Sequence, residues 1–240
     1  MAISRLSIIV PVYNERETVV PVLRKLMDLP LPEGTRKEVV VVDDASTDGS
    51  GQVLAEFVES GGYGNQMQFH RHFHNKGKGG SIATALKHIS GDYFIIQDAD
   101  LELDPADMLP MMQLVNDGAA DVVYGSRFLN CQPDYKSLSG LANGFLTWFS
   151  NVSFGTSLTD METCYKLIPA SAMNDIVIRE MRFGFEPEIT AKLSRGKKHR
   201  FAEVPVRYQA RTNTEGKKIG WKDGVRAVWC IIQYGILKKS

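Results

Sequence analysis

The sequence predicts an α/β fold, a layered sandwich with a mainly parallel central sheet and a smaller C-terminal portion. Apolar strand-like runs alternate with helical patterns up to about Phe128, and this alternation implies right-handed crossovers between parallel strands. The first run, residues 6–12, is almost continuously apolar, which is typical of a strand buried on both faces. The 240 residues are enough for one large domain of this kind.

The first half is expected to contain five strands, of which the first four are each followed by a helix. After the first strand, Asn14 and Glu17 have the spacing of a capping box, so we expect Asn14 to cap the first helix. The strands are expected over residues 6–12, 38–42, 67–73, 93–96 and 121–125, and the later helices over residues 53–58, 81–89 and 105–116.

The pattern changes after Phe128. Residues 137–153 carry no charge and place apolar side chains at helical spacing, which predicts an amphipathic helix and not a membrane span. Beyond it we expect a short strand over 164–168, a helix over 186–194, an edge strand over 199–207 and a last helix over 221–237. No repeat or linker divides the chain, so we expect a single domain over residues 1–240.

Composition excludes several classes of protein. Acidic and basic residues balance at 28 each, so no overall charge favours nucleic acid as a partner. Cys131, Cys164 and Cys230 are scattered without CxxC spacing, which indicates a reducing compartment with neither a disulfide framework nor a zinc site. No run reaches the roughly 18 apolar residues of a spanning helix, so we expect a cytoplasmic protein that is not integral to a membrane.

Two carboxylates follow the expected strand over residues 93–96. Alternation along an extended chain sends Asp98 and Asp100 in the same direction, and Glu102 continues the series. Hard oxygen donors at the carboxyl end of a strand suit a divalent cation that also binds phosphates. For an isolated Asp-x-Asp, however, a solvated acidic turn before the helix opened by Pro105 would be the more common outcome.

Other polar segments are expected beside these carboxylates, because the carboxyl ends of parallel strands meet at one edge of a sheet. Together they supply acids for a metal ion and a ribose, and cations for phosphates. Asp48 and Asn75 are better explained as capping or turn residues. The segments are residues 11–15, 43–44, 75–78, 98–102 and 125–127.

Common nucleotide-binding motifs are missing from this edge. The sequence has no GxxxxGK[ST] phosphate loop after the first strand and no GxGxxG turn there. A nucleotide would therefore be bound through carboxylates and a metal ion. His70, His72 and His74 alternate along one expected strand and offer a second metal site, although a solvated or partly packed strand edge is the commoner outcome.

These segments together resemble glycosyltransferase family 2, whose members have the Rossmann-like GT-A fold. The resemblance covers about the first 130 residues in the family's order. Residues 159–163 and 211–219 resemble the polyprenyl-phosphate glycosyltransferases, nearest the dolichyl-phosphate glucosyl- and mannosyltransferase group. The QxxRW signature of processive polysaccharide synthases is absent, which argues against a polymerase. The motifs that carry the resemblance to family 2 lie at residues 10–15, 42–49, 75–77, 98–100 and 125–127.

The resemblance implies a donor site in the nucleotide-sugar-binding half, residues 1–128. Asp98 would orient the nucleotide, and Asp100 would bind Mg²⁺ or Mn²⁺ on the diphosphate. Asp98 and Glu102 would complete the metal site, although related sequences often carry Gln at the position of Glu102. The base, ribose and phosphates would be contacted by Pro11, Tyr13, Glu15, Asp44 and Lys78.

The acceptor site would combine the acceptor-binding half, residues 129–240, with Arg127 from the first half. Arg127, Arg211 and Lys218 would face the acceptor phosphate, since Arg makes bidentate phosphate contacts and Lys supplies a point charge. Without the resemblance, Arg211 and its neighbouring lysines would read as an exposed, solvated loop. Asp160 would be the general base for a hydroxyl acceptor. A phosphate acceptor is already largely anionic at neutral pH, and Asp160 would then orient the cations or the sugar.

Two apolar helices fit a lipid acceptor at a membrane surface. The basic residues Lys238 and Lys239 follow the second helix, as expected near an anionic surface. Ordinary core packing is an equally good explanation of each helix. The first helix offers Phe145, Trp148 and Phe149, and the second offers Trp221, Val225, Trp229, Ile232 and Ile236.

The implied activity is an inverting, metal-dependent transfer of one sugar, of glucose or mannose type, from a UDP- or GDP-sugar to a polyprenyl or dolichyl phosphate. The enzyme would associate peripherally with the cytoplasmic face of a membrane. The alternatives are a soluble family-2 transferase acting on a saccharide or protein hydroxyl, and an inactive nucleotide-sugar-binding module. The sugar, the base, the lipid chain and the oligomeric state stay open.

Overall fold

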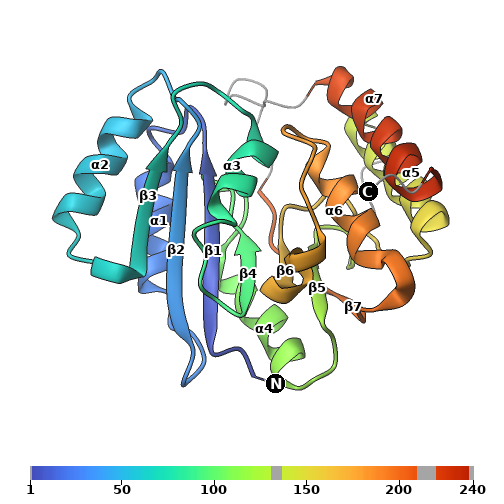
Figure 1. Cartoon of the computed structure of the whole chain (residues 1–240), viewed down its shortest axis with the longest axis horizontal. Coiled ribbons are helices and arrows are strands. Elements are labelled where there is room, and N and C mark those ends of the chain that lie inside the picture. Colours follow the sequence, from blue (N-terminus) through green and yellow to red (C-terminus); the bar gives the residue numbers. More distant parts are fainter. Residues whose placement is uncertain (1, 131–136, 210–219, 238–240) are drawn as a thin grey trace.

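The computed structural model describes residues 2–130, 137–209 and 220–237, which form a seven-stranded sheet with helices on both faces (Figure 1). The strand order is β3-β2-β1-β4-β6-β5-β7. Strand β6 runs antiparallel to β4 and β5, and the other neighbouring pairs are parallel. The strands are β1 (Arg5–Val12), β2 (Arg36–Asp43), β3 (Met67–Arg71), β4 (Tyr93–Ile96), β5 (Val122–Ser126), β6 (Lys166–Pro169) and β7 (Phe201–Pro205).

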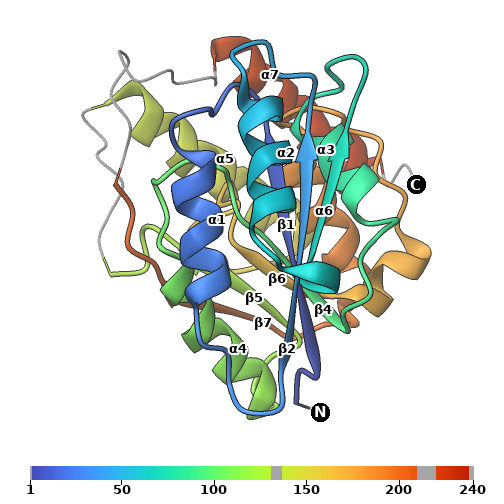
Figure 2. The same ribbon diagram turned by 90° about the vertical axis from the view of Figure 1, so that its left-hand side faces the viewer.

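The helices form two layers on the sheet and a third group beyond one of them. Helices α1, α2 and α4 cover one face, and α3 and α6 cover the other (Figure 2). Helices α5 and α7 pack outside α6, at the end of the molecule opposite α2 (Figure 1). The α-helices are α1 (Val19–Asp28), α2 (Ser50–Ser60), α3 (Lys78–Ala85), α4 (Met108–Asn116), α5 (Leu138–Phe154), α6 (Phe185–Ser194) and α7 (Trp221–Cys230).

Short helical turns extend several of these elements. In the part of the chain that the structure describes, four are 3₁₀ turns, and a π-helical segment continues α7 through Ile231–Ile236. The 3₁₀ turns span Gly64–Gln66, Pro105–Asp107, Ala170–Asp175 and Arg195–Lys197.

The apolar runs of β1 and β2 serve two cores at once. Ile8 and Val10 point into the core beneath α1 and α2, whereas Ile9 points into the core beneath α3 and α6. Val41 and Val40 divide between the two cores in the same way. Period-two alternation in strands covered on both faces explains why these runs are continuously apolar.

Local details differ from the sequence predictions. Asn14 does not cap α1, which begins at Val19 without a side-chain cap. The backbone of Asn14 adopts a left-handed φ of 52°, and its Oδ1 accepts a hydrogen bond from Thr47 N at 2.9 Å. Strand β3 ends at Arg71 and not at residue 73, and α3 begins at Lys78, three residues earlier than expected.

Glycines let the start of α3 pack directly on the segment before α6. A Cβ atom added to Gly79 would lie 1.9 Å from the carbonyl oxygen of Glu180. Gly80 N donates a 3.0 Å hydrogen bond to the carbonyl oxygen of Met181. Because both partners are backbone atoms, only glycine at position 79 permits this approach.

We predict opposite effects of alanine at two helical glycines. Gly79→Ala should lower the free energy of unfolding by about 1–3 kcal/mol, because the added methyl group must push the backbone of Glu180 away. Gly224→Ala, in α7, has nothing within 4 Å of the added atom and should raise it by up to about 1 kcal/mol. Urea unfolding of both variants tests this, and equal effects would contradict the close packing at Gly79.

Candidate functional site

The carboxyl ends of β1, β2, β4 and β5 meet at the upper edge of the sheet in Figure 1. Val12, the last residue of β1, pairs with Asp43, the last residue of β2. Asp98 follows the end of β4, and Arg127 follows the end of β5. The sequence-predicted edge is therefore the edge at which these residues meet.

Asp44 holds the loop between β3 and α3. Its carboxylate accepts hydrogen bonds from Lys76 N at 2.8 Å and Gly77 N at 2.6 Å, and pairs with His72 Nδ1 at 2.7 Å. The residue is 2% exposed. Asp44 therefore fixes the loop that carries Lys78, and its contact with a nucleotide base stays a prediction.

The loop after β1 is braced by the loop after β2. Asn14 N donates to Ser46 Oγ at 2.9 Å, and Asp48 accepts from Ser50 N at 2.9 Å, as expected of a capping residue. Between these anchors, Tyr13 is 38% exposed beside the half-buried Pro11. Glu15 is buried and accepts a 2.7 Å hydrogen bond from Thr18 Oγ1.

Lys78 links the end of β4 to α6. Its Nζ lies 3.0 Å from Asp98 Oδ1 and 3.1 Å from Glu186 Oε1. Burial alone would lower the pKa of Lys78, but the two carboxylates outweigh it and raise that pKa well above its usual value. Lys78 is therefore a permanent cation beside Asp98.

Asp98, Asp100 and Glu102 do not form a closed metal cage. Asp100 Oδ1 accepts a 3.1 Å hydrogen bond from Glu102 N, which closes a tight turn. In the described ranges, no group of three His, Cys, Asp or Glu side chains converges as a metal site. The half-buried carboxylates nevertheless supply the hard oxygen donors that Mg²⁺ and Mn²⁺ prefer. They fit a cation whose remaining ligands come from phosphate oxygens and water.

The three histidines do not share a strand face. Strand β3 ends at Arg71, so His72 and His74 lie beyond it. His72 is buried between Asp44 and Thr84 Oγ1, whereas His70 stacks on His88 with ring centroids 3.9 Å apart. The less common alternative, a second metal site on this strand, is not formed by these three histidines, because the chain leaves the sheet before the alternation is complete.

Asp160 and Arg127 form a bidentate ion pair. Arg127 Nε donates to Asp160 Oδ2 at 2.7 Å, and Nη2 donates to Oδ1 at 2.8 Å. The Asp160 side chain is fully buried, and the Arg127 side chain is 16% exposed. The guanidinium also lies 5.2 Å from the ring centroid of Tyr208. Asp160 therefore fixes the position of Arg127.

A further set of buried charges was not identified from the sequence. Lys166 lies on β6, is fully buried and donates to the carbonyl oxygens of Met161 and Thr163. Glu162 and Glu186 lie near it, and burial lowers the pKa of Lys166 while it raises that of Glu162. A lysine inside an otherwise apolar strand run was the available signal.

An apolar surface covers the outer sides of α5 and α7. Phe145, Trp148 and Phe149 form a ring cluster on α5, with centroids 6.0–6.4 Å apart. Phe149 and Ile232 are half-buried, and Phe149 packs against the small core of Leu146, Met161, Ala227 and Ile231. We call the exposed set the α5–α7 face: Leu141, Phe145, Trp148, Val152, Val225, Trp229, Ile236 and Leu237.

Some predicted residues lie outside the described residues: Arg211, Lys218, Lys238, Lys239 and Cys131. The side chain of Trp221 is likewise not described. Among the helices that are described, none combines the length and the apolar character needed to cross a membrane.

The chain is similar to a known protein family and to curated proteins from two bacteria. The glycosyl transferase family 2 model matches residues 7–174. An undecaprenyl-phosphate 4-deoxy-4-formamido-L-arabinose transferase of Edwardsiella ictaluri is 27% identical over 213 residues, which are 88% of this chain and 62% of that protein. The protein of the same description from Klebsiella pneumoniae subsp. pneumoniae is 30% identical over 122 residues, 50% of this chain and 36% of its own length. The chain thus spans less than two thirds of these relatives.

Solved structures share the fold at low sequence identity. A mannosyltransferase from Pyrobaculum calidifontis, in complex with GDP-Man and Mn²⁺, has a TM-score of 0.65 at 18% identity and covers all of this chain and 66% of its own. Glucosyl-3-phosphoglycerate synthase from Mycobacterium tuberculosis, with Mn²⁺ and UDP bound, has a TM-score of 0.69 at 15% identity and covers 97% and 80%. Both likenesses confirm the predicted GT-A fold.

We predict that the Asp160–Arg127 pair is strongly coupled. Asp160→Asn should lower the free energy of unfolding by about 3–5 kcal/mol, because it leaves a largely buried guanidinium without its anion. Asp121→Asn is a matched control, since Asp121 pairs with Arg200 through the same two-bond geometry at a much more exposed position. Its cost should be about 1 kcal/mol or less. Urea unfolding of both variants, with Arg127→Met to close a double-mutant cycle, measures the coupling, and equal costs would contradict it.

Proposed function

This chain belongs to glycosyltransferase family 2, and on that premise we propose that it transfers one sugar from a nucleotide-sugar to a polyprenyl phosphate at a membrane surface. The acceptor class is that of the matched curated relatives, which act on undecaprenyl phosphate by their descriptions. We keep glucose and mannose as candidate sugars and UDP and GDP as candidate carriers. Residues 1–128 would supply most of the donor site, and residues 129–240 most of the acceptor site.

The Asp160–Arg127 pair is the observation that carries this proposal. Both carboxylate oxygens of Asp160 are occupied by the guanidinium, so Asp160 is poorly placed to remove a proton from a hydroxyl acceptor. A phosphate acceptor does not need that step at neutral pH, since it is already largely an anion. Arg127 would then be a fixed cation for this anion, held by Asp160 in the orienting role.

The proposed reaction is an in-line displacement with inversion. An acceptor phosphate oxygen forms a bond to the anomeric carbon as the bond from that carbon to the nucleoside diphosphate breaks. Lys78 would hold the diphosphate beside Asp98, and Arg127 would orient the acceptor. A divalent cation on Asp100 and Asp98, with Glu102 as a further ligand, would offset the charge of the leaving diphosphate. Pro11, Tyr13, Glu15 and Asp44 remain proposed contacts for the base and ribose.

A donor screen tests the activity. The full chain is mixed with UDP- and GDP-sugars and a short-chain polyprenyl phosphate, with and without Mn²⁺, and lipid-linked sugar is measured. We expect metal-dependent transfer from one donor, and a loss of about 100-fold or more in Asp100→Asn, because metal-based charge stabilisation contributes several kcal/mol. The control is Asp175→Asn, because Asp175 is an exposed residue that is not part of the proposed site.

Other outcomes of the screen select the alternatives. Transfer to a saccharide or protein hydroxyl, without transfer to the lipid phosphate, would favour the soluble family-2 transferase. Binding of a donor without transfer or hydrolysis would favour an inactive module. Asp160→Asn alone does not separate these cases, because it also releases Arg127. Arg211→Ala and Lys218→Ala are cleaner, since a phosphate-free acceptor would make both side chains dispensable.

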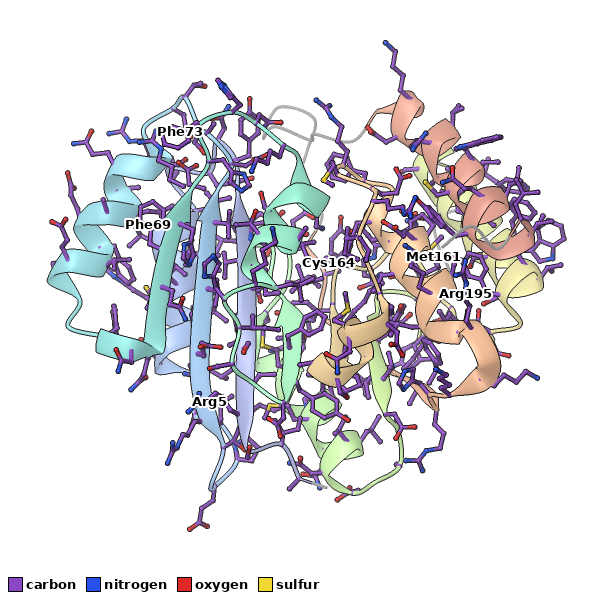
Figure 3. All side chains as sticks on the ribbon, in the orientation of Figure 1. Arg5, Phe69, Phe73, Met161, Cys164 and Arg195 are labelled. Carbon is purple, nitrogen blue, oxygen red and sulfur yellow. The ribbon has the colours of Figure 1, made fainter. Side chains whose placement is uncertain are left out.

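We further propose that the α5–α7 face docks on the membrane that holds the acceptor. Trp148→Ser combined with Trp229→Ser should weaken binding to vesicles containing anionic lipid by about tenfold or more, because each exposed indole would lose its burial in the interface. Phe73→Ser is the control, since Phe73 is 97% exposed but lies at the other end of the molecule (Figure 3). Co-sedimentation measures both, and equal losses would contradict this orientation.

A further inference from the structure

A buried cluster of charged side chains lies between the proposed donor and acceptor ends of the site. Lys78 comes from α3, Glu186 from α6 and Lys166 from β6, and Glu162 precedes β6. Cys164 lies between Glu162 and Lys166 in sequence, and Figure 3 shows it near the middle of the molecule. The cluster is therefore linked both to Lys78, on the proposed donor side, and to Arg127, on the proposed acceptor side.

Two carboxylate oxygens in this cluster have no hydrogen-bond partner. The Glu186 side chain is only 5% exposed, and its Oε1 atom pairs with Lys78. Its Oε2 atom is buried and has no hydrogen-bond partner. Glu162 Oε1 is buried and unpartnered as well. A folded protein rarely leaves buried carboxylate oxygens unmatched, because the lost hydration is not recovered. Such atoms are explained when a ligand supplies the missing donors.

The neighbouring cations already have other partners. Lys78 Nζ is held by Asp98 as well as by Glu186, and Lys166 Nζ donates to two carbonyl oxygens. Glu162 interacts electrostatically with Glu186 and Lys166, and also with the Arg127–Asp160 pair. The two unmatched oxygens therefore belong to side chains that connect to the Lys78–Asp98 pair through Glu186 and to the Arg127–Asp160 pair through Glu162.

We propose that Glu162 and Glu186 accept hydrogen bonds from hydroxyl groups of the transferred sugar and select an uncharged sugar over one that carries a carboxylate. This inference rests on the proposed function and deepens it. A sugar whose diphosphate lies at Lys78 and Asp98 would have its ring beside Glu186, one side chain away. The 14% exposed Lys78 side chain covers this approach, and a bound diphosphate would draw it toward the phosphates.

Charge explains the selectivity. Hydroxyl groups donate to carboxylates without adding net charge to a buried cluster. A uronate sugar would bring another carboxylate against Glu186, where like charges repel strongly because water is excluded. Burial raises the pKa of Glu162, so Glu162 would add hydrogen bonding and little charge. Glu186 would therefore reject uronates, while both glutamates orient the anomeric carbon of a neutral hexose.

Affinity ratios test the inference separately from catalysis. Dissociation constants are measured by calorimetry for UDP and UDP-glucose and for GDP and GDP-mannose, with Mn²⁺ present. For the series that binds, the ratio of the diphosphate to the nucleotide-sugar constant reports the contacts of the sugar. We expect Glu186→Gln and Glu162→Gln to lower this ratio by about fivefold or more. Affinity for the diphosphate alone should change by less than about twofold in Glu162→Gln, because Glu162 does not contact Lys78.

Glu38→Gln is the matched control, because Glu38 is also a buried, hydrogen-bonded glutamate but lies on β2 near the opposite edge of the sheet. Its ratio should equal that of the unmodified protein. Thermal unfolding checks that each variant is folded. If a Gln variant does not fold, the Asp variant at the same position is used in its place. The matching uronate, UDP-glucuronate or GDP-mannuronate, should bind about tenfold more weakly than the hexose, with a smaller gap in Glu186→Gln.

Three results would overturn the inference. Equal weakening of diphosphate and nucleotide-sugar would mean that Glu186 only holds Lys78. An unchanged ratio in both variants would mean that the sugar does not contact the pair, and equal binding of the uronate would remove the selectivity. If neither the UDP series nor the GDP series binds to the unmodified protein, the donor part of the proposed function is overturned instead.

Discussion

The reversed direction of β6 is the constraint on which the site depends. Strand β6 is inserted between β4 and β5 and runs antiparallel to both, so it starts at the edge where its neighbours end. The residues just before it, Asp160 and Glu162, are thereby placed beside Asp98 and Arg127. A parallel strand at this position would have put these acids at the opposite edge. One reversal in an otherwise parallel sheet therefore brings the proposed acceptor-side acids to the edge that carries the proposed donor carboxylates.

The site is stabilised by pairing its charges before any substrate is present. Lys78 is shared by Asp98 and Glu186, and Arg127 is held by Asp160, whose backbone N–H in turn donates to Glu203. Buried ions lose their hydration, and hydrogen-bonded partners recover only part of that loss. Such clusters contribute little to stability compared with an apolar core. In the proposed function, their value would be that the cations are already gathered where the phosphate groups bind.

The fold and the location of the site could be predicted because they depend on patterns with a strong period. The apolar runs of β1 and β2 and the acids that follow β2 and β4 were enough to place the edge. The direction of β6 could not be predicted, because a strand of four buried residues reads the same both ways. The local fold at Asn14 was missed because its side chain bonds to Thr47, which is distant in sequence. Glu186 resembled an ordinary first-turn acid of α6, and only its contact with Lys78 reveals otherwise.

The packing of Gly79 against Glu180 has a consequence for how such proteins exchange parts during evolution. The family-defined region ends at residue 174, yet the loop that carries Lys78 lies against residues 180 and 181 and is paired with Glu186. Glu180 is bound in turn to Arg226 of α7. A recombination event at the end of the shared region would separate these contacts. Lineages that acquire a new C-terminal segment must therefore adapt the Lys78 loop to it, so the proposed donor and acceptor preferences should diverge together.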